Sequence, residues 1–136
     1  MPACVPGHTI APARRRIDTL VTLGTPHQGS RWAHVVPTPL VRQLRPGSPL
    51  LRELEQPAPG CRTRITAIYS DLDQMLLPTS SGRCDHPDLR ARNVLFRGAG
   101  HMSLPIHRGV IDEVAATLAG LRTPGTSAQV SPAAVA

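Results

Sequence analysis

Short apolar runs alternate with helix-forming segments along the chain. Residues 18–23 (DTLVTL) are apolar on both faces and end at a Gly-Thr-Pro turn, which is typical of a strand buried in a parallel sheet. Residues 64–70 (RITAIYS) and 92–97 (RNVLFR) are rich in β-branched or aromatic residues, and a Gly-Ala-Gly loop follows the latter. These runs predict three strands, near 18–23, 64–70 and 92–97.

Helical periodicity is strongest over residues 106–121. Apolar residues recur there at helical spacing, and Gly120 lies near the end, where helices commonly terminate. We expect this helix to pack on the sheet through Ile111, Val114 and Leu118.

Shorter helices are expected between the first two strands. Ser48 and Pro49 suit an N-cap and a first helical position, so a helix is predicted over residues 50–56. A short helix is also expected after Pro39. Strands that alternate with helices predict an α/β fold, with a parallel sheet covered on both faces.

The chain is expected to form one domain with unstructured ends. Residues 1–16 and 123–136 are rich in small residues and proline and show no hydrophobic period, whereas residues 17–122 hold every predicted element. A chain of 136 residues is long enough to bury a core. No apolar run approaches the roughly 20 residues of a membrane span.

The chain carries a formal charge of +6, and all of its basic residues other than histidine are arginines. Apart from residues 14–16 they are scattered singly, and only Trp32, Tyr69 and Phe96 are available to stack on bases. This pattern disfavours a nucleic-acid partner and favours a solvated, Arg-rich surface. A non-catalytic interaction module that uses this surface is the alternative to an enzyme.

The cysteines and histidines show no metal-ligand spacing, so no metal site is expected. Of Cys4, Cys61 and Cys84, the last two can close a loop worth about 3 kcal/mol, provided that the compartment is oxidising. Two buried free thiols are the alternative. The first residues lack the apolar region of a signal peptide. The chain is therefore expected either to be cytoplasmic or to lack its true start, and the compartment stays open.

Polar loops follow all three predicted strands. They are residues 24–30 (GTPHQGS), 70–74 (SDLDQ) and 98–101 (GAGH), and in a parallel sheet such loops meet at the carboxyl edge. An aspartate of the second loop can accept the Nδ1–H of His101, fix its tautomer and leave Nε2 as a general base. A surface histidine in a polar loop is the alternative.

Three stretches, in this order, resemble parts of one known family. They are residues 21–30 (VTLGTPHQGS), 67–78 (AIYSDLDQMLLP) and 92–104 (RNVLFRGAGHMSL). They are similar to a late strand and loop, the acid loop and the histidine loop of bacterial triacylglycerol lipases and related esterases. Acid before histidine is the order of the α/β-hydrolase fold. The resemblance, over residues 17–121, implies an ester hydrolase that acts on acyl esters or lipids without a cofactor.

The resemblance assigns catalytic roles to two residues. Asp73 stands at the position of the family's acid and His101 at that of its histidine, as two members of a Ser-His-Asp triad. Asp71 is the competing acid, but Asp73 is favoured because the family's acid precedes an apolar run like residues 75–77. His27 is expected to shape the loop after the first strand, and lining the site is the alternative for this residue.

The family's nucleophile is missing from the chain. It lies in a G-x-S-x-G motif on a strand-to-helix turn. The nearest match, residues 78–82 (PTSSG), lacks the first glycine, and Ser30 and Ser103 are no better placed. We therefore expect the C-terminal portion of an α/β-hydrolase, from a truncated or misannotated reading frame. Without nucleophile and oxyanion hole, the isolated chain is expected to be inactive and poorly soluble.

Overall fold

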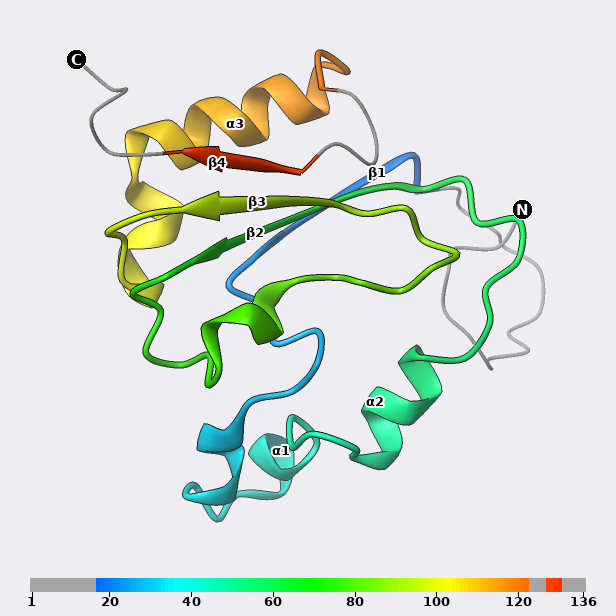
Figure 1. Cartoon of the computed structure of the whole chain (residues 1–136), viewed down its shortest axis with the longest axis vertical. Coiled ribbons are helices and arrows are strands. Elements are labelled where there is room, and N and C mark those ends of the chain that lie inside the picture. The colour runs from blue at the N-terminus through cyan, green and yellow to red at the C-terminus, as the bar shows by residue number, and fades with distance from the viewer. Residues whose placement is uncertain (1–16, 123–126, 131–136) are drawn as a thin grey trace.

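Four strands pair in parallel in the computed structural model, which describes residues 17–122 and 127–130. Across the sheet they run in the order β1 (Thr19–Leu23), β2 (Arg64–Ser70), β3 (Arg92–Phe96) and β4 (Ala128–Val130) (Figure 1). Leu23 lies opposite Ile68, Ile68 opposite Val94, and Val94 opposite Ala128. The α/β fold and the three predicted parallel strands are confirmed.

The core lies on the two central strands. Six of the seven residues of β2 are buried, as expected for a strand covered on both faces. One cluster joins the central strands to the histidine loop and the last helix; it consists of Ile68, Val94, Phe96, Ala99, Leu104 and Val110. In contrast, β1 has no fully buried residue, because it lies at the edge of the described sheet.

The helices lie on opposite sides of the strands (Figure 1). On one side are α1 (Pro39–Arg42) and α2 (Pro49–Leu54), and on the other α3 (Arg108–Leu118). The side chain of Ser48 caps α2 by accepting the N–H of Leu51 at 3.2 Å. Three 3₁₀ segments complete the fold: η1 (Arg31–His34), η2 (Thr79–Gly82) and η3 (His101–Ile106).

The inner face of α3 differs from the predicted one. Val114 packs against the core as expected, but Ile111 and Leu118 are 48% and 59% exposed, so their predicted packing is wrong. The buried face holds Glu113, whose carboxylate pairs with the guanidinium of Arg92 at the start of β3 and lies 3.2 Å from that of Arg122. The buried face of α3 therefore consists of Val110, Glu113 and Thr117, and Ile111 and Leu118 face outward.

The segment 123–136, expected to be unstructured, contains β4. Its residues Ala128 and Val130 pack against the core, and Val130 accepts the N–H of Arg97 at 3.1 Å. A strand of three residues is too short to show a periodicity in the sequence. The predicted lead at 1–16 and the rest of the predicted tail, 123–126 and 131–136, lie outside the described residues.

The proposed bridge between Cys61 and Cys84 is wrong. Cys84 is a buried free thiol, whereas Cys61 is disulfide-bonded, which also removes the alternative of two free thiols. The backbone of Cys84 is bonded to Asn93 near the start of β3, while Cys61 lies three residues before β2. In the described part of the chain, no helix is long and apolar enough to cross a membrane.

Candidate functional site

The loops that follow β1, β2 and β3 supply the residues of the candidate site. Because the three strands are parallel and adjacent, their carboxyl ends meet at one edge of the sheet. Leu23, Ser70 and Phe96 are the last residues of the three strands. The loops that carry Gly24, Asp73 and His101 therefore start side by side.

Asp73 and His101 form a hydrogen-bonded pair at this edge. Oδ2 of Asp73 lies 2.8 Å from Nδ1 of His101, while its Oδ1 accepts the N–H of Met75 at 2.9 Å. The Asp73 side chain is fully buried, and that of His101 is 34% exposed. Among the described residues, Nε2 of His101 makes no hydrogen bond. The predicted contact is confirmed; the catalytic roles of the two residues stay predictions.

Asp71, the competing acid, bonds elsewhere. Its Oδ1 accepts the N–H of Gly98 at 2.8 Å, and its Oδ2 lies 3.4 Å from the guanidinium of Arg97. The side chain therefore connects the loop after β2 to the loop after β3. Asp71 ties together the loops that carry Asp73 and His101, while Asp73 alone of the two carboxylates contacts the ring.

Gly24 is a residue of the site that the sequence analysis missed. Its N–H donates to the carbonyl of Ile68 at 2.8 Å, and its φ is +58°. A Cβ at this position would lie 2.9 Å from both Asp73 Oδ2 and His101 Nδ1. In the sequence Gly24 reads only as part of a turn after a strand, and no pattern there indicates contact with residues so far along the chain.

His27 bonds back to β1 and not to the Asp73–His101 pair. Its Nε2 lies 2.8 Å from Oγ1 of Thr22. Burial lowers the pKa of His27, because the imidazolium form loses hydration there. This arrangement agrees with a role in shaping the loop after β1.

None of the serines singled out in the sequence bonds to His101 among the described residues, and two of them donate to backbone carbonyls. Oγ of Ser30 donates to the carbonyl of Met75 at 2.7 Å, and Oγ of Ser103 donates to that of Gly100 at 2.8 Å. Ser81 lies in η2, with a buried hydroxyl that has no hydrogen-bond partner among the described residues. In the described ranges, no hydroxyl group bonds to the ring of His101.

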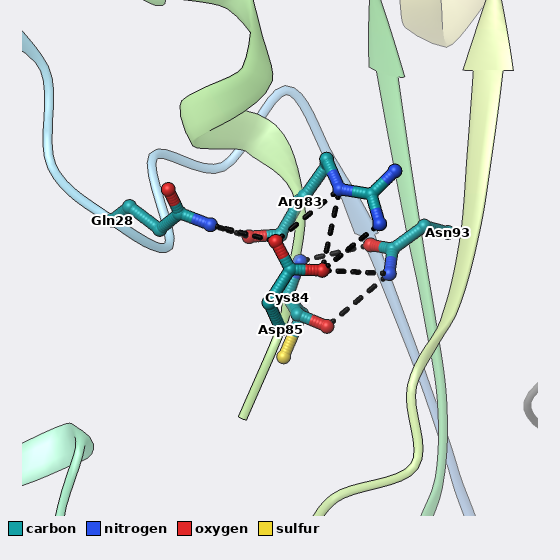
Figure 2. A network of polar contacts seen from close by, with 5 residues as sticks. All are labelled: Gln28, Arg83, Cys84, Asp85 and Asn93. Carbon is teal, nitrogen blue, oxygen red and sulfur yellow. Dashed lines mark hydrogen bonds and ion pairs between the residues drawn. The ribbon is translucent and has the colours of Figure 1, made fainter. Parts of the chain in front are cut away.

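A second polar network holds the loop after β1 against β3 (Figure 2). Gln28 donates to Asp85 at 2.9 Å, and Asp85 pairs with Arg83 at 3.1 Å. The amide of Asn93 bonds to both backbone groups of Cys84. Burial raises the pKa of the Cys84 thiol and so disfavours the thiolate. We therefore assign this network a structural role.

The comparisons with known proteins leave the family open. No protein-family model matches the sequence, and no curated protein matches it either. In chemical terms, the site offers one oriented imidazole with a free nitrogen, next to a buried carboxylate. Among the described residues, no three His, Cys, Asp or Glu side chains are grouped as metal ligands.

Proposed function

We propose that the chain carries the acid and histidine of a Ser-His-Asp ester hydrolase of the lipase/esterase type. The observation that supports this most directly is the bond of 2.8 Å between Asp73 and Nδ1 of His101 at the carboxyl edge of a parallel sheet. The order of the two residues along the chain, acid before histidine, agrees with the α/β-hydrolase order.

In this proposal the two side chains divide the work of a triad. Asp73 accepts the Nδ1–H of His101, which leaves the lone pair on Nε2 as general base. Nε2 takes the proton of a hydroxyl nucleophile as that oxygen attacks the ester carbonyl, and then gives it to the leaving alcohol. The carboxylate stabilises the imidazolium formed in between. The sequence holds no G-x-S-x-G motif, so in this proposal the nucleophile comes from outside this chain.

An apolar rim supports an acyl substrate. The loops on either side of the pair expose large apolar side chains to solvent, namely Leu72, Met75, Met102 and Ile106, which we call the apolar rim. An acyl chain is a suitable ligand for such a surface, because its burial removes apolar area from water. The Arg-rich interaction module lacks a comparable observation, since several arginines pair with carboxylates: Arg83, Arg92, Arg97, Arg108 and Arg122.

The proposal can be tested with a fusion protein that provides the nucleophilic serine. The strand, G-x-S-x-G turn and preceding half of a bacterial triacylglycerol lipase are fused ahead of residue 17, and hydrolysis of a short-chain nitrophenyl ester is measured. We expect His101→Ala to abolish turnover and Asp73→Asn to lower kcat by about 10⁴-fold, because the wrong tautomer then faces the nucleophile. Asp71→Asn keeps its acceptor oxygen and is expected to cost less than about 10-fold.

The isolated chain provides the second arm. Residues 1–136 alone are expected to hydrolyse the ester at the background rate, and a fluorophosphonate is expected to label no serine. Stoichiometric labelling of one serine would reveal a nucleophile within the chain. Equal activity of the fusion with and without Asp73 and His101 would refute the proposal. If the fusion fails to fold, the ring ¹⁵N chemical shifts of His101 in the isolated chain provide the test. A ring that does not carry its proton on Nδ1 would refute the proposal.

A further inference from the structure

We propose that Gly24 is a positioning residue for the Asp73–His101 pair. The loop backbone touches the pair at the hydrogen bond itself, and the absence of a side chain at Gly24 makes room for that bond. This inference deepens the proposed function and rests on it, but the geometry that carries it is independent of which nucleophile completes the site.

The space around Gly24 is already filled by the pair. A Cβ at this position would lie 2.9 Å from Oδ2 of Asp73, 2.9 Å from Nδ1 of His101 and 3.0 Å from Cε1 of the same ring. These are the two atoms that make the hydrogen bond, together with the carbon next to one of them. Real Cβ atoms essentially never approach another heavy atom closer than 3.0 Å. Any side chain at Gly24 must therefore displace something.

The backbone of Gly24 is poorly placed to move away. Its N–H is bonded to the carbonyl of Ile68 at 2.8 Å, which continues the pairing of β1 with β2. Asp73 is also fixed, because its side chain is fully buried and its Oδ1 accepts the N–H of Met75. The His101 ring is the far end of a side chain that is 34% exposed. The ring is thus the group that yields, and its contact with Asp73 is what is lost.

The Asp73–His101 bond lies beside the backbone of Gly24 in a site where the Asp73 side chain is fully buried. Oδ2 of Asp73 is thus closed to water. A charge-assisted hydrogen bond is stronger when water is excluded from it. The absence of a side chain at Gly24 leaves room for the bond between Asp73 and His101.

Gly60 provides a matched control. It also has a positive φ, +77°, but nothing lies within 4 Å of the Cβ position. An alanine at either position adopts an unfavourable left-handed backbone, so Gly60→Ala reproduces the backbone effect without the contact. Gly24→Asn is the complementary variant, because asparagine tolerates the left-handed region better and still introduces a Cβ.

The experiment measures the ring of His101 directly. Residues 1–136 with ¹⁵N-labelled histidine are examined by NMR, and the His101 signals are assigned through their loss in His101→Gln. In the wild type and in Gly60→Ala we expect a strongly deshielded, slowly exchanging Nδ1–H proton. In Gly24→Ala and Gly24→Asn we expect this signal to be lost, while the backbone amide spectrum retains the folded pattern.

Each other outcome contradicts a defined part of the argument. Retention of the Nδ1–H signal in both Gly24 variants would overturn the inference, as would its loss in folded Gly60→Ala. If both Gly24 variants unfold while Gly60→Ala folds, the added side chain disrupts the whole fold and not the Asp73–His101 bond alone. The inference is then again wrong. Absence of the signal from the wild type would instead refute the Asp73–His101 pair, and with it the proposed function.

Discussion

The carboxyl edge of the sheet and its outer flank use their side chains in opposite ways. At the carboxyl edge, the carboxylates of Asp71 and Asp73, the Nδ1 of His101 and the backbone N–H of Gly24 each have a specific hydrogen-bond partner. We group as the outer flank three exposed apolar side chains that lie outside the core cluster, Leu20 on β1 and Ile111 and Leu118 on α3. Leu20 faces away from α3, because side chains alternate along a strand and its neighbour Val21 packs against the cluster that includes Val110 of α3. These three apolar side chains are between 41% and 59% exposed.

This difference shows that the pair does not depend on what covers the flank. Every contact that defines Asp73 and His101 comes from the loops after β1, β2 and β3. The outer edge of β1, away from β2, has no strand partner among the described residues. An oriented acid–histidine pair can thus be complete on a sheet whose apolar flank is still open to water.

The largest expected difference between the two regions is in the free energy of unfolding, when one leucine of each region is replaced by alanine. Leu76 lies in the acid loop and is 1% exposed, whereas Leu118 belongs to the outer flank. Leu76→Ala is expected to lower the free energy of unfolding by about 2–5 kcal/mol, because it leaves a cavity. Leu118→Ala is expected to change it by no more than about 0.5 kcal/mol, since alanine also favours the helix. Urea denaturation measures both, and equal losses would mean that the flank is as covered as the edge.

The stability of the fold is expected to depend on pH through His27, which lies on the loop after β1. Burial lowers its pKa in the folded state below the ordinary value. The unfolded chain therefore binds the proton more tightly, and the contribution to stability is present above about pH 6.5 and lost as the pH falls below it. The slope cannot exceed about 1.4 kcal/mol per pH unit for one group.

The variant His27→Gln isolates this effect. Glutamine can still hydrogen bond with Thr22 but does not titrate, so the stability of the variant is expected to fall less steeply below pH 6.5 than that of the wild type. Chemical denaturation at a series of pH values gives both curves. Parallel curves would show that the ring is hydrated in the folded state.

Asp71 gives a smaller effect, confined to the carboxyl edge. Asp71→Ala removes the acceptor of the Gly98 N–H and is expected to lower the free energy of unfolding by about 1 kcal/mol, because Gly98 is exposed and water partly replaces the bond. Asp71→Asn keeps an acceptor oxygen and is expected to lose less. Asp112→Ala, in an exposed pair with Arg108, serves as the control without measurable loss. An Asp71→Ala variant as stable as that control would mean that the two loops hold their positions without this contact.

Sequence patterns predicted the three longer strands and the meeting of their loops, whereas the choice of Asp73 over Asp71 as the partner of His101 came from the family resemblance. Apolar runs identified the three longer strands, and adjacent parallel strands placed their following loops together. The inner face of α3 could not be predicted in the same way. The buried face of α3 includes Glu113, which pairs with Arg92, and periodicity reads both residues as solvent-exposed charges.

Gly24 and β4 escaped prediction for a different reason. The contact of Gly24 with Asp73 and His101 joins three separate loops, and a glycine in a turn carries no sign of its distant neighbours. Ala128–Val130 has no strand signal of its own, and it becomes a strand by pairing with β3. Both features are tertiary, so only the assembled sheet reveals them.

The smallest expected effect on folding per substituted site is at the outer flank, where the main expected consequence is for association between molecules. An open strand edge beside exposed apolar side chains promotes pairing between molecules, and lysine at such positions is a natural way to prevent it. The triple variant Leu20→Lys, Ile111→Lys, Leu118→Lys is expected to change the free energy of unfolding by no more than about 0.5 kcal/mol per site, because all three side chains already contact water. Sedimentation velocity at increasing concentration is expected to show self-association of the wild type and a marked decrease in the variant. The control places the same three charges on the apolar rim, as Leu72→Lys, Met102→Lys and Ile106→Lys. If the rim variant reduces association as much as the flank variant, general repulsion and not the open flank is the cause, and the two regions do not differ in the way the exposed side chains indicate.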